Sequence, residues 1–218
     1  TLFNAKKCGF PQRKNLAACV WSAGKGRTLC AKMERRCTER GEASVKKRIL
    51  LGLISVFKAL YNAVYAVMKL RPMQKKVVMI SRQSNSQRPD FEQLGAEIEA
   101  RDPGVRLVYL CREMGDTPLE LLRYCFHLLH CAAELSTAHV CIIDGYCIPV
   151  SVLHHRKELR VVQVWHALGA IKKFGRQALS VPGGRDKELA ERMGMHKHYD
   201  AVLCASHRTA KAYEEAFG

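Results

Sequence analysis

Residues 76–111 read KVVMISRQSNSQRPDFEQLGAEIEARDPGVRLVYLC, and their apolar runs indicate the fold class. The stretch begins and ends with a short run rich in Val, Ile and Leu, KVVMIS (76–81) and RLVYLC (106–111). Continuous apolar runs of this length are typical of parallel strands buried on both faces. The segment between them, DFEQLGAEIEAR from Asp90, has helical periodicity. The stretch therefore predicts a strand–helix–strand unit with a right-handed crossover.

The same alternation continues toward the carboxyl end of the chain. Helical patterns begin at Pro118, near Ile148 and at His207. Three further apolar runs lie between and beside them: VCIID (140–144), RVVQVW (160–165) and AVLCAS (201–206). Strands and helices that alternate in this way predict a three-layer α/β domain, a Rossmann-like lobe with a parallel sheet, over residues 72–218.

Polar residues follow three of these runs. Ligands of open parallel sheets bind beyond the carboxyl ends of the strands, so Ser81, Arg82, Asp144 and His166 are candidate site residues. The loop SRQSNSQRPD lacks glycine, and the chain contains no GxGxxG or Walker A sequence, so neither NAD nor ATP is expected and no cofactor is predicted. The cysteine spacings match no zinc pattern. The pairs His154–His155 and His196–His198 have spacings that could bind a metal but lack acidic or thiol partners at ligand spacing, so no metal site is expected.

The net charge of +16 is concentrated near the amino end of the chain. Residues 1–71 carry 16 Lys or Arg against three Glu, whereas residues 72–218 carry 20 basic against 17 acidic residues. A basic arm suits the phosphates of membranes and of nucleic acids equally well. Residues 1–44 show no sustained helical or strand period, and we expect a disordered or non-native leader there.

A strongly apolar helix is predicted over residues 45–71. Residues 49–68 contain one charge, Lys58, and twenty helical residues span about 30 Å, enough for the core of a bilayer. A narrow stripe of polar or small residues, which includes Ser55 and Asn62, favours a helix that lies in the membrane interface. Two alternatives stay open, a membrane-spanning anchor and a helix packed on the domain. We expect a membrane-associating helix.

The segment QVWHALGAIKKFGRQ (163–177) carries the most specific chemical signal. An imidazole at the end of a strand, that of His166, can take a proton from an alcohol near neutral pH. Lys172, Lys173 and Arg176 follow closely and could bind phosphate oxygens. Residue types alone allow a plainer interpretation, in which the histidine is a core residue and the lysines form a solvated helix face.

WHALGAIKKFG (165–175) resembles the WHG-then-Lys motif of the CDP-glycerol glycerophosphotransferase family, the polymerases and primases of teichoic acid synthesis. The resemblance covers about residues 46–218, and Ala167 stands where many members have Gly. Its further pieces are KKVVMISRQSNS with DFEQL, IIDGY, HRKELRVVQ, GMHKHYDAVLCAS and YEEAFG.

The resemblance implies a two-lobed GT-B enzyme that acts at the cytoplasmic face of the cell membrane as a peripheral protein. Such an enzyme passes a polyol phosphate from CDP-glycerol, or a related CDP-alcohol, to a hydroxyl of a membrane-linked polyol phosphate acceptor. The match covers the N-terminal, acceptor-side lobe, and we expect the C-terminal donor lobe to be missing from this chain. An anionic membrane surface is an expected partner, and nucleic acid is not.

The resemblance also implies roles for individual residues. His166 matches the proposed catalytic base of the family. The candidates for binding the substrate are Lys172, Lys173, Arg176, Asp144, Ser81, Arg82 and Gly169. Asp144 would orient the imidazole or bind acceptor hydroxyls, with a simple turn cap as the alternative. Ser81 and Arg82 would bind the phosphate of the acceptor, with plain loop residues as the alternative.

Two other functions remain open from the sequence. A GT-B glycosyltransferase that uses a nucleotide sugar would share the lobe. A non-catalytic basic module that binds membranes or nucleic acid would share the charged arm. Either would lack transfer of a polyol phosphate from a CDP-alcohol.

Overall fold

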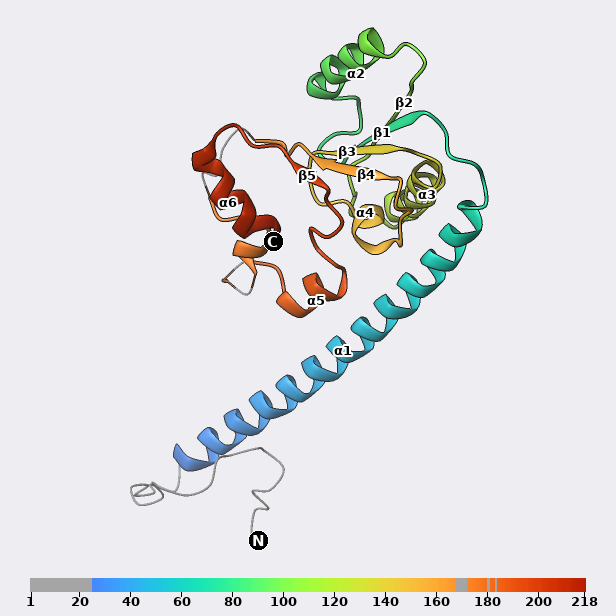
Figure 1. Ribbon diagram of the computed structural model, residues 1–218. Helices are drawn as coiled ribbons and strands as arrows, with labels where there is room; N and C mark the ends of the chain where they lie inside the picture. Colours follow the sequence, from blue (N-terminus) through green and yellow to red (C-terminus); the bar gives the residue numbers. More distant parts are fainter. Residues whose placement is uncertain (1–24, 168–171, 180, 183) are drawn as a thin grey trace. The chain divides into compact units, whose positions relative to one another are not determined.

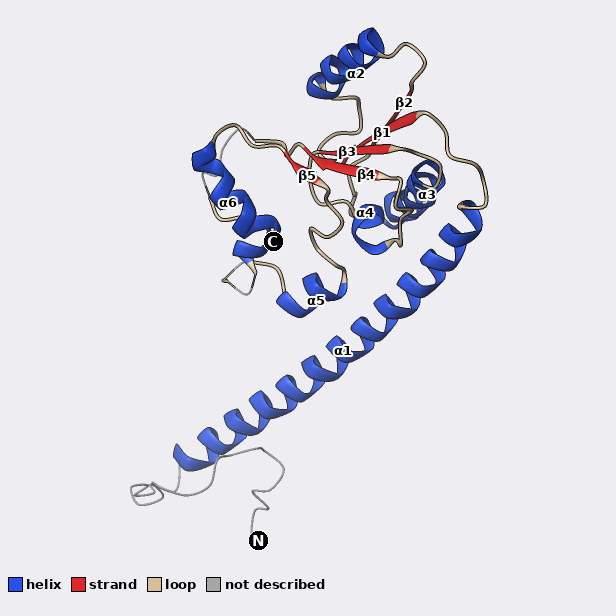
Figure 2. Cartoon of the chain, in the orientation of Figure 1, coloured by secondary structure: helices blue, strands red, loops and turns tan. Residues whose placement is uncertain are grey.

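Five parallel strands form one sheet, in the order β2-β1-β3-β4-β5 (Figures 1 and 2). The computed structural model describes residues 25–167, 172–179, 181–182 and 184–218, with side chains from Ser44 onward. The strands are β1 (Lys76–Ser81), β2 (Arg106–Cys111), β3 (Val140–Ile143), β4 (Arg160–Gln163) and β5 (Ala201–Val202). The predicted α/β fold with a parallel sheet is confirmed.

Helices connect the strands, as the periodicity predicts. Thr117 caps α3 with a reciprocal capping box that includes Glu120, and Ser206 caps α6 in the same way with Thr209. The described helices are α1 (Lys25–Met68), α2 (Pro89–Arg101), α3 (Pro118–Leu135), α4 (Ile148–Val152), the 3₁₀ helix η2 (Gly175–Ala178), α5 (Lys187–Arg192) and α6 (His207–Phe217).

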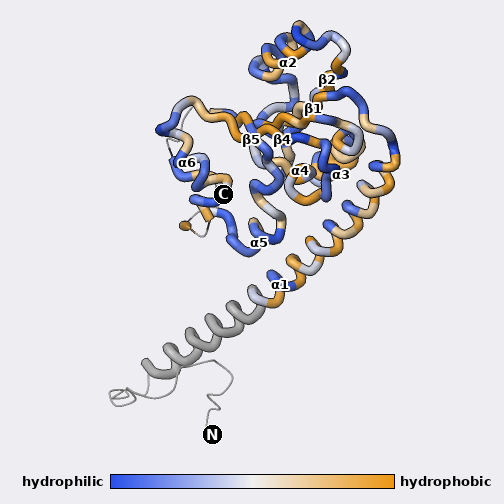
Figure 3. Tube along the Cα trace, in the orientation of Figure 1, coloured by the Kyte–Doolittle hydropathy of each residue, from blue (hydrophilic) through white to orange (hydrophobic). Residues whose placement is uncertain are grey.

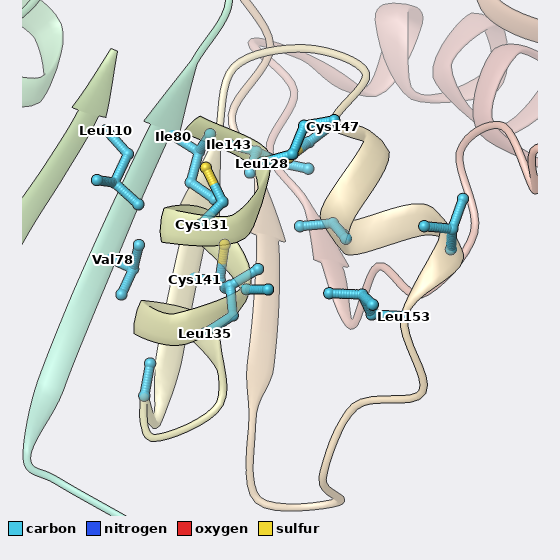
Figure 4. Packing of buried hydrophobic residues seen from close by; sticks show 14 of the residues in the cluster. Val78, Ile80, Leu110, Leu128, Cys131, Leu135, Cys141, Ile143, Cys147 and Leu153 are labelled. Atoms are coloured by element: carbon cyan, nitrogen blue, oxygen red, sulfur yellow. The ribbon is translucent and has the colours of Figure 1, made fainter. Parts of the chain in front are cut away.

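Both faces of the sheet are covered, which explains why the strands are apolar throughout. On one face, α3 and α4 pack against β1 and β3, and Val78, Ile143 and Leu135 belong to one cluster of buried residues (Figure 4). On the other face, Phe91 of α2 packs with Met79 in a smaller cluster. Burial of each such side chain stabilises the fold by about 1.5–3 kcal/mol.

Three strands are shorter than the apolar runs 140–144, 160–165 and 201–206. The fourth strand ends at Gln163 because Trp165 turns into the left-handed region, with φ of 55°. A side chain of this size is rarely found in that region, and the ladder cannot continue through it. The residues beyond the strand therefore form a loop at the carboxyl edge of the sheet.

Helix α1 begins at Lys25, about twenty residues before the predicted start at residue 45. Helix therefore extends through residues 25–44, where the sequence shows no sustained helical period. That segment is rich in Arg, Glu and Lys, which favour helix without needing an apolar period. The chain divides into two compact units, Thr1–Leu53 and Ile54–Gly218. The part of α1 from Ile54 onward therefore belongs to the same unit as the sheet. By length and composition, Ser44–Met68 could cross a membrane.

The last four turns of α1 pack on the α/β domain through one face. Tyr61 and Tyr65 are buried, and the Tyr61 hydroxyl donates a hydrogen bond to the Leu128 carbonyl of α3. His155 Nε2 lies 2.9 Å from the Val150 carbonyl, which can only accept, so Nδ1 accepts the Tyr65 hydroxyl at 3.0 Å. The neutral imidazole thus joins α1 to the loop after α4.

This contact makes the fold sensitive to acid. Burial lowers the pKa of His155 to about 4, against the opposing effect of the hydrogen bond to the Val150 carbonyl and with smaller contributions from His198, Lys69 and His154. A histidine whose pKa falls on folding stabilises the protein fully above about 6.5, the pKa in the unfolded chain. The stabilisation is lost progressively as the pH falls from about 6.5 to about 4.

We predict that the free energy of unfolding, measured by urea titration, falls between pH 6.5 and pH 4, with His155 contributing on the order of 2 kcal/mol. His155→Gln should flatten this dependence, although it lowers stability at pH 7. His207→Gln, at an exposed position of α6, is the control and should keep the wild-type slope. An equal slope in His155→Gln and wild type would contradict the assignment.

Candidate active site at the carboxyl edge of the sheet

The site lies where the strand order reverses. β1 and β3 are neighbours in the sheet although β2 lies between them in sequence, and such a switch point leaves a crevice beyond the carboxyl ends of the strands. A cavity of about 420 Å³ opens there. The loops after β1, β3 and β4 line it, among others, through Arg82, Gln83, Tyr146, Trp165 and His166.

His166 is exposed and lines this cavity. Its Nδ1 lies 2.9 Å from the backbone carbonyl oxygen of Asp144, which can only accept a hydrogen bond. The neutral ring therefore carries its hydrogen on Nδ1 and keeps a lone pair on Nε2. An imidazole held in this form can act as a general base.

Asp144 is not among the residues that line the cavity. It is buried, it accepts a hydrogen bond of 2.6 Å from the Ser81 hydroxyl, and it lies 3.6 Å from Arg88 Nε. Burial raises the pKa of Asp144, against the opposing effects of Ser81, Arg88 and His166. The structure thus brings Asp144 to His166 through its backbone and holds Ser81 behind the cavity.

Three cationic side chains line the cavity. Arg82 and Lys172 are among the residues predicted from sequence, and Arg185 is an addition. The Arg185 guanidinium lies 5.7 Å from the ring centroid of Tyr146, and Arg82 Nη1 donates a hydrogen bond of 3.4 Å to the Tyr146 carbonyl. None of the described lining residues is Asp or Glu, so the cavity suits an anion.

The other predicted cations lie elsewhere. Lys173 and Arg176 are exposed and do not line the cavity beside His166. Arg176 lines a second cavity, of about 630 Å³, beside α6. Gly169 lies outside the described residues, as do its neighbours 168, 170 and 171. Of the predicted residues, the structure brings together His166, Lys172 and Arg82 in the cavity.

Aromatic rings support the loop that carries His166. The Trp165 ring stacks on Phe174 with centroids 4.7 Å apart and meets Phe217 of α6 edge to face at 5.4 Å. His196 forms the wall between the two cavities, and burial, with the charges of Arg185 and Arg176, lowers its pKa to about 4. It is therefore neutral at pH 7. In the part of the chain described, no three His, Cys, Asp or Glu residues gather to hold a metal ion.

Sequence reasoning missed Arg185 because no strand precedes it. The residue lies in VPGGRD (181–186), a turn-like segment far along the chain from any apolar run. The sequence shows only an arginine that follows two glycines, and such a residue is common in surface loops, so it does not by itself indicate a site. In the structure, the Arg185 guanidinium lies over the Tyr146 ring and near Met195 Sδ, which places it at the cavity.

The fold and the cavity define an α/β lobe with a tautomer-fixed histidine among cations, an arrangement suited to group transfer between phosphorylated substrates. The chain belongs to the CDP-glycerol:poly(glycerophosphate) glycerophosphotransferase family, whose sequence model matches residues 63–218. The resemblance found in the WHALGAIKKFG block is thereby confirmed.

Several characterised proteins are similar to the chain. A teichoic acid ribitol-phosphate primase of Bacillus spizizenii is 29% identical over 166 residues, which is 76% of this chain and 43% of the primase. A teichoic acid glycerol-phosphate primase of Bacillus subtilis is 29% identical over 92 residues, 42% of this chain and 24% of that protein. A solved structure of the wall teichoic acid polymerase TagF superposes with a TM-score of 0.50 at 11% identity, covering 78% of this chain and 45% of the polymerase.

The chain therefore spans less than half the length of these relatives. At 11% identity, the likeness to the polymerase structure concerns the fold alone. It agrees with the parallel sheet described above.

Proposed function

We propose that this chain is the acceptor-binding lobe of an enzyme that transfers a polyol phosphate from CDP-glycerol, or a related CDP-alcohol, to a hydroxyl of a membrane-linked polyol phosphate acceptor. The observation that carries the proposal is the exposed His166, whose Nδ1 is bonded to the Asp144 carbonyl in a cavity lined by cations. Membership of the glycerophosphotransferase family supports the choice of donor.

The proposed reaction is an in-line displacement at phosphorus. Nε2 of His166 removes the proton of the acceptor hydroxyl, and the oxygen attacks the phosphorus that bears the polyol. The bond from that phosphorus to the bridging oxygen breaks, and the oxygen leaves with CMP. Nearby cations would stabilise the negative charge on the phosphoryl oxygens, which is the main catalytic contribution in transfers of this kind.

Arg82 and Arg185 are the proposed binding groups for a phosphate of the acceptor. Both guanidinium groups lie beside Tyr146, and Lys172 lines the same cavity. Arginine binds phosphate oxygens with paired, charge-assisted hydrogen bonds. Ser81 and Asp144 would then support the loop from behind the cavity, and Lys173 and Arg176 would lie outside the acceptor subsite.

Two helices supply a surface for peripheral association with the membrane. Apolar residues of α1 that face away from the domain are exposed, and Figure 3 shows them as apolar positions along the helix. The outer face of α3 is apolar too, and the bond from Tyr61 to Leu128 makes the two helices neighbours. We define the apolar surface as Leu60, Val64, Val67, Leu122, Phe126 and Leu129, all at least 40% exposed.

This arrangement favours a helix that lies on the membrane over one that crosses it. Asn62 Nδ2 donates to the Val152 carbonyl at 2.9 Å, and Asn62 Oδ1 accepts from the His154 backbone at 2.8 Å. A spanning helix would lose these bonds and expose buried Tyr61 and Tyr65 to lipid. Anionic lipid is the proposed partner, since basic residues flank the apolar stretch in sequence.

We predict that His166→Gln in the complete gene product lowers CMP release from CDP-glycerol or CDP-ribitol by at least about a hundredfold, because the base is lost. The assay supplies membranes as acceptor and compares UDP-sugars as donors. His139→Gln is the control, since His139 is exposed at the opposite edge of the sheet. Wild-type CMP release by His166→Gln would contradict the proposal, as would turnover with UDP-sugars alone.

We predict that Arg185→Met weakens binding of glycerol 3-phosphate to the chain by about tenfold, which is the effect of losing a hydrogen bond to a charged group. The titration is followed through the NMR signals of the His166 ring. Arg160→Met is the matched control, because Arg160 pairs with Asp200 at the amino end of β4. Equal weakening in the two variants would show a general charge effect and would remove Arg185 from the site.

We predict that combined Leu60→Ser, Val67→Ser and Phe126→Ser reduces binding to phosphatidylglycerol vesicles at least about tenfold, because each apolar side chain buried in lipid contributes about 1.5–3 kcal/mol. Leu203→Ser, at another exposed apolar position, is the control and should bind as wild type. Undiminished binding by the triple variant in a vesicle flotation assay would refute the membrane surface.

A further inference from the structure

Gln163, the last residue of β4, is a fully buried polar side chain that uses both ends of its amide. Its Oε1 accepts a hydrogen bond of 2.9 Å from the backbone N–H of Trp165. Its Nε2 donates a hydrogen bond of 3.1 Å to the carbonyl of Gly145. The amide therefore bridges the loop after β3 and the loop after β4, the two loops that meet at His166.

Three consecutive carbonyls, beginning with that of the last residue of β3, accept hydrogen bonds from the chain around the end of β4. The Val164 N–H donates to Ile143 at 2.8 Å, His166 Nδ1 donates to Asp144 at 2.9 Å, and Gln163 Nε2 donates to Gly145 at 3.1 Å. The hydrogen bond from His166 to the Asp144 carbonyl, which sets the tautomer, is thus flanked on one side by the backbone bond to Ile143 and on the other by the Gln163 bond to Gly145. If the Gly145 carbonyl turned, the Asp144 carbonyl would lose its direction toward the ring.

The same side chain holds the turn that presents the histidine. Trp165 has φ of 55°, a conformation that bulky residues adopt only when the surroundings impose it. At this turn the Trp165 N–H does not pair with a neighbouring strand. It donates its hydrogen bond to Gln163 Oε1 instead. Without that acceptor, a partly buried N–H would lack this partner and the turn would relax toward extended backbone.

We infer that Gln163 is a positioning residue, which fixes the Nδ1–H tautomer and the orientation of His166 by clamping the turn at Trp165 and the carbonyl of Gly145. The inference deepens the proposed function in one respect, since the tautomer matters for catalysis only if His166 is the base. The effect of Gln163 on the His166 tautomer, however, can be measured in the 218-residue chain without an activity assay.

The test is nitrogen-15 NMR of the histidine rings, at a pH where the His166 ring is neutral. The signals of His166 among the nine histidines are those that His166→Gln removes. In the wild type, the Nδ1–H form of His166 should predominate. Gln163→Met, which keeps the length of the side chain and removes both hydrogen bonds, should shift the ring toward a mixture of the two tautomers.

Two further variants make the result decisive. Gln163→Asn retains an amide but is one carbon too short to span both loops, so it should shift the tautomer as well, even if Gln163→Met fails to fold. Val161→Ala removes buried packing from the same strand without touching these bonds, and it should keep the wild-type tautomer.

An unchanged tautomer in a folded Gln163→Met or Gln163→Asn protein would overturn the inference, and so would an equal shift in Val161→Ala. Neither result bears on CMP release by the complete enzyme. Conversely, full activity of His166→Gln would reject the proposed function and leave the tautomer measurement intact. The two failures are therefore distinguishable.

Discussion

The hydrogen bond from His166 Nδ1 to the Asp144 carbonyl is the interaction on which the site depends. It requires the ends of β3 and β4 to lie side by side, which the parallel pairing of Ile143 with Gln163 achieves. That pairing depends in turn on apolar strands covered by helices on both faces. The core thus sets which ring nitrogen is bonded to the backbone, and it leaves Nε2 as the proposed base.

The positive charge of the cavity depends on the position of the Asp144 carboxylate. Asp144 is buried against the Ser81 hydroxyl, so it does not neutralise the cations at the cavity wall. Arg82 and Arg185 remain available to an anionic ligand. The phosphate of an acceptor would supply negative charge to pair with these arginines, and a hydroxyl of the same acceptor could reach the His166 imidazole.

The last part of helix α1 has two faces of different character, one that packs on the α/β domain and one that is apolar and exposed. Tyr61, Asn62 and Tyr65 face the domain and make hydrogen bonds to it. Leu60 and Val67 occupy the outer face and are exposed. We propose that this outer face lies on the membrane, which would hold the cavity near a lipid-linked acceptor.

Much of the fold was predictable because buried parallel strands leave continuous apolar runs, such as KVVMIS and RLVYLC. The edge of the sheet that carries His166 followed from the same runs. Asp144 was predicted to orient the imidazole or bind acceptor hydroxyls, but the contact through its backbone carbonyl could not be predicted, because a carbonyl has no sequence signature. Gln163 looked like an ordinary strand residue. Arg185 lies at the cavity through tertiary contacts such as that of its guanidinium with the Tyr146 ring, which the sequence does not indicate.

The most direct test of this account is a crystal structure of the chain soaked with glycerol 3-phosphate, a minimal analogue of the acceptor. The account predicts that the phosphate binds between Arg82 and Arg185 and that a hydroxyl lies within hydrogen-bonding distance of His166 Nε2. A ligand bound elsewhere, or bound with its hydroxyls directed away from His166, would contradict it.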